Sequence, residues 1–166
     1  MKTAWQEARS TWLTADESPR NREETVTGRR KRSALERADA AFEKTCAVGH
    51  PHEQPLAVVA MRQEWLRHRL RTHLEAQGQH VLVVDDGADA LGTCAASSPD
   101  LLVCEQPLPS LVTSDLVRWL HVLCPQLRIV VQLDDPSTAG AILDAGAAAV
   151  TSRSTGVEEL FRLVHP

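Results

Sequence analysis

The sequence lacks the features that would place the chain in or across a membrane. It contains no run of about 18 apolar residues, which excludes a transmembrane helix of ordinary length. Its first ten residues, MKTAWQEARS, are polar where a signal peptide requires an apolar stretch. We therefore expect a cytoplasmic protein with no membrane contact.

Cysteine is sparse, and its spacing does not favour a disulfide framework or a zinc site. The four cysteines form no CxxC pair, and three of them lie inside apolar stretches, at Cys94, Cys104 and Cys124. A free thiol in such a stretch behaves as a small hydrophobe, so we expect buried, reduced thiols.

Charge and hydrophobicity divide the 166-residue chain into two parts. Its 43% hydrophobic content is sufficient for one folded domain plus an extension. Residues 1–54 carry 10 basic and 9 acidic side chains, whereas residues 55–166 carry 8 and 13, a net charge of −5. The second part is the expected folded domain.

The first 54 residues are expected to form an extension of short helices and flexible basic linker. The run DESPRNREETVTGRRKR has no periodic apolar face, which is typical of a linker. Short helices are predicted at 3–14 and at 34–47, the second opened by a capping box of Ser33 and Glu36. Its apolar stripe could dock on the domain or pair with a second copy.

Two groups of side chains in this extension have chemical alternatives. The basic run from Arg29 to Arg32 could contact nucleic acid phosphates, but no aromatic or helix-turn-helix context accompanies it, so a solvated linker is favoured. Cys46, His50 and His52 are ligand-type side chains, yet no second ligand pair follows to complete a zinc site. Nucleic acid and metal are therefore not expected partners here.

From residue 56 onward, β-branched runs alternate with helical patterns, which predicts βαβ units and a parallel sheet. Strands are predicted at 56–60, 80–84, 101–104, 128–133 and 147–151. Helices are predicted at 62–77, 88–97, 113–123, 136–145 and 157–164, the first with Trp65, Leu66, Leu70 and Leu74 inward and the last opened by Thr155 and Glu158.

Three stretches resemble the receiver domain of response regulators: PDLLVCEQPLPS, ILDAGAAAV and GVEEL. The resemblance covers about two thirds of the chain and implies a flavodoxin-like, doubly wound, five-stranded parallel sheet of order 2-1-3-4-5. It also implies a bacterial two-component signalling context, with a phosphorelay as its family chemistry and a protein as partner.

Receivers hold an acidic pair after strand one, an acceptor Asp after strand three, a hydroxyl after strand four and Lys after strand five. The acidic pair binds Mg²⁺, the Asp is the nucleophile, and the other two bind phosphoryl oxygens. The resemblance places Ala60, Met61, Glu105, Leu133, and Arg153 or a neighbour at these positions. None matches, so we expect a degenerate phosphoacceptor pocket and no phosphotransfer.

The sequence VVDD at 83–86 looks like the acidic motif of receiver strand one, but the chain after it is too short for the remaining elements. The separation of Met61 and Glu105, 44 positions, fits the usual gap between acidic pair and acceptor. Asp85, Asp86 and Glu105 remain weak candidates for a displaced metal site at the carboxyl ends of the strands. Solvated turn acids are the favoured interpretation.

The expected function is that of a pseudo-receiver, a non-enzymatic interaction module that works without phosphorylation and without a cofactor. Glu105 could mimic the phosphorylated state, although an ordinary strand-end residue is the simpler interpretation. The alternatives are a small-molecule-binding flavodoxin-like domain and a transcription regulator using the basic N-terminal arm. The partner is expected to be a protein, with a homodimer as a further option.

Overall fold

The computed structural model describes Glu36 and residues 54–165. Apart from Glu36, which is helical and exposed, the predicted helices at 3–14 and 34–47, the basic run and the Cys46–His52 group lie outside the described residues. None of the described helices is both long and apolar enough to span a membrane.

Within residues 54–165, strands and helices alternate along the chain. The strands are β1 (Leu56–Ala60), β2 (His80–Val84), β3 (Leu101–Glu105), β4 (Arg128–Leu133) and β5 (Ala149–Ser152). The helices are α3 (Glu64–Ala76), α4 (Gly87–Ser97), α5 (Thr113–Leu123), α6 (Ala139–Asp144) and α7 (Val157–Val164), with 3-10 turns η1 (Pro136–Thr138) and η2 (Arg153–Thr155).

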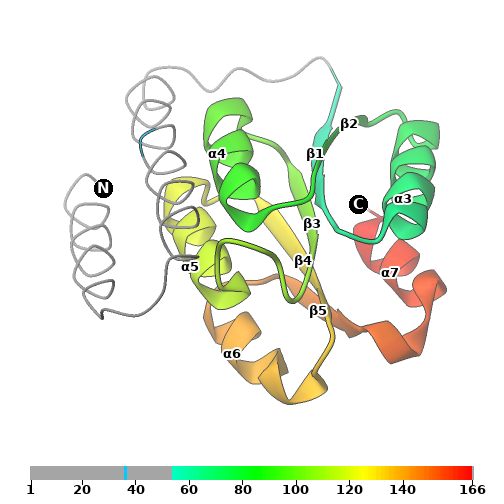
Figure 1. Ribbon diagram of the computed structural model, residues 1–166. Coiled ribbons are helices and arrows are strands. Elements are labelled where there is room, and N and C mark those ends of the chain that lie inside the picture. The colour runs from blue at the N-terminus through cyan, green and yellow to red at the C-terminus, as the bar shows by residue number, and fades with distance from the viewer. Residues whose placement is uncertain (1–35, 37–53, 166) are drawn as a thin grey trace, which may run out of the picture.

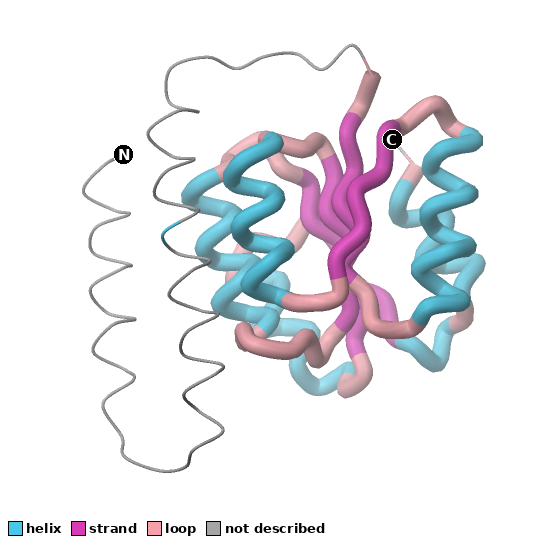
Figure 2. Tube along the Cα trace, turned by 45° about the horizontal axis from the view of Figure 1, so that its top comes forward, coloured by secondary structure: helices cyan, strands magenta, loops and turns pink. Residues whose placement is uncertain are grey.

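The five strands form one parallel sheet of order β2-β1-β3-β4-β5, which confirms the predicted topology. Figure 1 shows α4, α5 and α6 on one face of the sheet and α3 and α7 on the other. Figure 2 shows the strands as a central layer between the two helical layers. Because both faces are covered, the central strands are mostly apolar, and β1 and β3 are buried along their whole length.

Each face of the sheet has its own hydrophobic core. Alternate residues of a strand point to opposite faces, so Val58 and Leu102 contact the α4–α6 layer while Val59 and Val103 contact the α3–α7 layer. Helix α3 contributes Leu66, Leu70 and Leu74, spaced by four residues along one stripe. Packing on both faces holds the five strands in place, and therefore also holds the edge of the sheet at which the strands end.

Several local predictions were wrong in instructive ways. Trp65 is 55% exposed because it lies about 100° around α3 from Leu66, outside the apolar stripe. The predicted capping box of Thr155 and Glu158 is absent: α7 has Gly156 as N-cap and no side-chain cap bond. The Thr155 hydroxyl instead donates to the Ser152 carbonyl oxygen at 2.6 Å.

Other elements differ from prediction at their ends. The helix predicted at 136–145 is divided into η1 and α6, because Pro136 opens a 3-10 turn whose cap is the Asp135 carboxylate. The last strand begins at Ala149 rather than at 147, and the first helix starts at Glu64 rather than at 62. These shifts leave the strand order unchanged.

Candidate functional site

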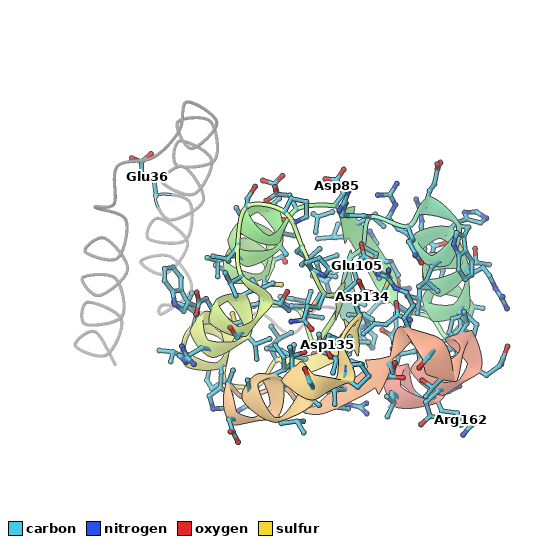
Figure 3. All side chains as sticks on the ribbon, turned by 60° about the horizontal axis from the view of Figure 1, so that its bottom comes forward. Glu36, Asp85, Glu105, Asp134, Asp135 and Arg162 are labelled. Carbon is cyan, nitrogen blue, oxygen red and sulfur yellow. The ribbon has the colours of Figure 1, made fainter. Side chains whose placement is uncertain are left out.

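The carboxyl ends of β1, β3 and β4 meet at one edge of the sheet, since all the strands are parallel and adjacent. Glu105 is the last residue of β3 and lies at this edge with only 2% of its surface exposed. Figure 3 labels Glu105 there, between Asp85 after β2 and Asp134 after β4. A buried carboxylate is the most unusual chemical group at this edge, because a charge leaves water only when it is paired.

Both oxygens of the Glu105 carboxylate have hydrogen-bond partners. The backbone N–H of Arg62 donates to Oε1 at 2.5 Å, and Nη2 of Arg153 donates to Oε2 at 3.0 Å. Arg62 follows β1 and Arg153 follows β5, so segments from both sides of β3 converge on this one side chain. These bonds compensate the cost of burying its charge.

The Arg153 guanidinium joins two acidic residues across the edge. In addition to its bond to Glu105, its Nη1 lies 3.2 Å from Oδ1 of Asp134, the residue after β4. The Arg153 side chain is 35% exposed and that of Asp134 is 54% exposed, so the pair opens toward solvent only at the Asp134 end. The Arg153 Nε atom is buried and makes no hydrogen bond within the described part of the chain.

The positions predicted for an acidic pair carry no side-chain oxygen. Ala60 and Met61 are both fully buried, and the hydrogen bonds of Met61 involve its backbone. Its N–H donates to the Val84 carbonyl at 3.1 Å, and its carbonyl accepts from Arg67 Nη1 at 3.2 Å. A hard cation such as Mg²⁺ takes oxygen ligands, commonly including one or two carboxylates. The side chains of Ala60 and Met61 supply none, so these two positions do not fit the expected acidic pair.

Leu133, which was expected at the hydroxyl position of the pocket, is only 2% exposed. It packs in the same core cluster as Ala60, on the α4–α6 side of the sheet. Of the five residues predicted for the pocket, the structure therefore brings Glu105 and Arg153 into direct contact. Ala60, Met61 and Leu133 contribute packing.

The weak metal candidates Asp85 and Asp86 have different surroundings. Asp85 is exposed, whereas Asp86 is buried and caps α4: its Oδ1 accepts from the N–H groups of Ala88 at 2.7 Å and Asp89 at 3.3 Å. Its Oδ2 accepts from the Ser110 hydroxyl at 2.5 Å, which ties the β3–α5 loop to the start of α4. In the described ranges, no group of three His, Cys, Asp or Glu side chains could hold a metal ion.

Two members of the hydrogen-bond and ion-pair network around Glu105 and Arg153 were not predicted from the sequence. Asp134 could have been found, because it directly follows a predicted strand and parallel strands end at a common edge. The contribution of the Arg62 backbone N–H could not be predicted from residue type, because every residue except proline has such a donor. Its role depends on where the chain turns after β1, which brings residue 62 to a carboxylate 43 positions away.

Burial and hydrogen bonds shift the pKa values of two groups next to the site. Burial raises the pKa of the Cys104 thiol to about 12, and the neighbouring Glu105 charge acts in the same direction. Cys104 is therefore a neutral thiol in the core at physiological pH. At the exposed end of the edge, hydrogen bonds from the Ser137 hydroxyl and backbone N–H lower the pKa of Asp135.

The sequence matches no protein-family model and no curated protein sequence. Its fold, however, matches solved response-regulator structures. A DNA-binding response regulator of the LuxR family from Staphylococcus aureus is 15% identical, with a TM-score of 0.59 over 66% of this chain and 95% of that one. The signal receiver domain of an HD domain-containing protein from Pseudomonas fluorescens is 20% identical, with a TM-score of 0.61 over 68% and 92% of the two chains.

A Francisella response regulator receiver domain is likewise 20% identical, with a TM-score of 0.58 over 66% of this chain and 93% of that one. The chain has the receiver fold. The matched share, about two thirds of the chain, agrees with the length of the sheet-and-helix unit described above. At these identities the likeness concerns the receiver fold, and the chemistry of this receiver-like edge must be argued from its own residues.

Proposed function

We propose that residues 55–166 are a pseudo-receiver: a signalling module that binds a protein partner without being phosphorylated, with residues 1–54 as a separate extension. The observation that carries this proposal is the buried Glu105–Arg153 ion pair. Glu105 is the last residue of β3, and the receiver resemblance expects the acceptor carboxylate after the third strand.

Phosphoryl transfer to a receiver requires a nucleophilic carboxylate and a metal ion that positions the phosphoryl group. At this edge, the Glu105 oxygens accept from Arg62 and Arg153, and Glu105 is 2% exposed. Ala60 and Met61 replace the metal-binding acids with apolar side chains. In-line attack depends on placement within a fraction of an ångström. A longer carboxylate that is engaged by two donors, with apolar side chains at residues 60 and 61, does not meet that requirement.

The guanidinium of Arg153 supplies a permanent positive charge next to Glu105. In a phosphorylatable receiver the charge at this edge changes with each cycle, and that change is the signal. Here the charges of Glu105, Arg153 and Asp134 belong to the chain itself and are paired with one another. On this proposal, the charge at the edge does not change through a phosphorylation cycle.

Incubation of the full chain with Mg²⁺ and acetyl phosphate, followed by intact-mass measurement, tests this proposal. We expect an unchanged mass, while a phosphorylatable receiver treated in parallel gains a phosphoryl group. The Glu105→Gln variant is the matched control. A mass increase in the native chain that disappears in that variant would show that Glu105 is an acceptor and would refute the proposal.

The alternative functions depend on other parts of the chain. A small-molecule site would use the strand edge, but Ala60 and Leu133 pack in the core there and Glu105 is ion-paired. A DNA-contacting regulator would use the Arg29–Arg32 run, which lies outside the described residues. DNA binding that weakens strongly with salt and disappears when residues 1–54 are removed would favour a DNA-contacting regulator over the proposed pseudo-receiver.

A further inference from the structure

A second group of polar side chains lies between the last turn of α3 and the end of α7. Helices α3 and α7 cover the same face of the sheet and lie side by side in Figure 1. Helix α3 starts after the carboxyl end of β1, so its last turn lies at the opposite edge of the sheet from Glu105. We call this group, made of His73, Gln77 and His165, the two-histidine cluster.

Imidazole nitrogens from both helices approach one atom in this cluster. Gln77 Nε2 lies 2.8 Å from His73 Nε2 and 3.1 Å from His165 Nε2, with His165 Nδ1 at 3.4 Å. His73 and Gln77 are four residues apart on α3 and therefore share one face. His165 comes from 88 positions further along the chain. The fold thus creates this convergence, which no local motif predicts.

The two histidines are held in place by contacts outside the cluster. The His73 ring stacks on Phe161 of α7, with ring centroids 4.4 Å apart and an interplanar angle of 7°. Arg128 clamps the end of α7, donating from Nη1 to the His165 carbonyl at 2.7 Å and from Nη2 to the Leu163 carbonyl at 2.8 Å. Orientation of ligands by such outer contacts is typical of built sites.

The third member of the cluster has an unused acceptor. Gln77 Oε1 is buried and has no hydrogen-bond partner among the described residues. A buried acceptor without a partner costs about 1–3 kcal/mol in general. Turning the Gln77 amide by half a turn exchanges its nitrogen and oxygen. That rotation would aim Oε1 toward the ring nitrogens and give a set of two nitrogens and one oxygen.

We propose that the two-histidine cluster binds a late first-row divalent transition ion, such as Zn²⁺ or Cu²⁺. Imidazole nitrogen is a preferred ligand of these ions, and water can complete the coordination sphere. Ligand atoms of a tetrahedral zinc ion lie about 3.4 Å apart, as follows from metal–ligand distances near 2.1 Å. The distances of 2.8 and 3.1 Å from the Gln77 amide to the two imidazoles are close to that spacing.

The side chains in and around the cluster indicate which class of ion it would bind. Arg69 lies over the Phe161 ring at 5.4 Å from its centroid, and Arg128 contacts the His165 backbone. These positive charges act on every divalent cation alike, so the ligand types decide: the cluster has no carboxylate, whereas hard cations such as Mg²⁺ and Ca²⁺ bind mainly through oxygen ligands. An ion bound through imidazole nitrogens is the class that fits. Once bound, it would fasten the end of α7 to α3, independently of the function proposed for the Glu105 edge.

Calorimetric titration of the untagged full chain with ZnCl₂, and separately with CuCl₂, tests the site. The background variant Cys46→Ala, His50→Gln, His52→Gln removes the other ligand-type group of the chain. We expect one ion per chain in this background. His73→Gln and His165→Gln should each weaken binding by more than about tenfold, since residues that only orient a ligand contribute about 10- to 100-fold.

Two further variants make the test specific. His68→Gln removes an exposed imidazole from the same helix and should leave the affinity unchanged. Gln77→Glu should tighten binding, because a carboxylate is a stronger oxygen ligand than an amide. Binding should weaken in acid, where protons compete for the imidazoles. Equal affinity in the background chain and in both histidine variants, or no binding at all, would overturn the proposal.

Discussion

Replacing Arg153 with Met tests whether the buried ion pair holds the Glu105 edge together. The Met side chain keeps most of the apolar stem but removes the charge and all the donors. Among the described residues, Glu105, 2% exposed, would then keep only the Arg62 N–H as a hydrogen-bond partner. Removing one partner of a fully buried pair costs about 3–5 kcal/mol. Because Arg153 is itself 35% exposed, water reaches the gap, and we expect a loss of about 2–3 kcal/mol in unfolding free energy.

The assay is urea unfolding of four proteins: the native chain, Arg153→Met, Glu105→Gln and the double variant. A coupling of about 1–2 kcal/mol is expected from this cycle, because the two residues contact directly. Asp134→Asn is the matched control: it removes the exposed arm of the same guanidinium and should cost about 0–1 kcal/mol. If Arg153→Met costs no more than Asp134→Asn and the coupling is near zero, the ion pair does not organise the edge.

Two further predictions concern glycines and thiols. Gly146→Ala should destabilise the domain by about 1–3 kcal/mol, because the φ of Gly146 is +112° and an added Cβ would lie 2.6 Å from His121 Cγ. Gly140→Ala, in open space within α6, should instead stabilise the domain by about 0.5–1 kcal/mol. Thermal unfolding compares the two variants, and equal shifts in their unfolding temperatures would contradict this prediction. Iodoacetamide at pH 7.5, read by peptide mass spectrometry, should modify Cys104 and the half-buried Cys124 readily only after denaturation. Burial raises the pKa of Cys104 to about 12 and of Cys124 to about 11, so rapid native labelling of either thiol would contradict these pKa shifts.

The parallel sheet could be predicted because its signals are local. The spans of β1, β2 and β4 are bounded by proline, glycine or acidic turn residues and filled with β-branched side chains, and the structure confirms all three. Trp65 shows the limit of this reasoning. Its size suggested burial, but the position of a side chain around a helix, rather than its hydrophobicity, decides whether it faces the core.

The candidate site was predictable only in part. Its positions followed from the receiver resemblance, which led to Glu105 and Arg153. Their contact joins residues 48 positions apart and depends on the β3-β4-β5 order bringing two strand ends to one edge. The Arg62 N–H and the Asp134 carboxylate complete the network, and a backbone donor leaves no trace in the sequence. Family position predicted the residues, while tertiary structure determined what they contact.

The most direct test of the central claim is a titration of the isotopically labelled full chain with Mg²⁺ and beryllofluoride, which mimics the phosphoryl group in receivers. Backbone NMR spectra would be followed at Arg62, Glu105, Asp134 and Arg153. We predict no saturable shift at these four residues, because Arg153 pairs with the Glu105 carboxylate and the buried residues Ala60 and Met61 carry no side-chain oxygen for a metal ion. Saturable, Mg²⁺-dependent shifts centred on Glu105 would show that the edge still binds a phosphoryl group and would contradict the account.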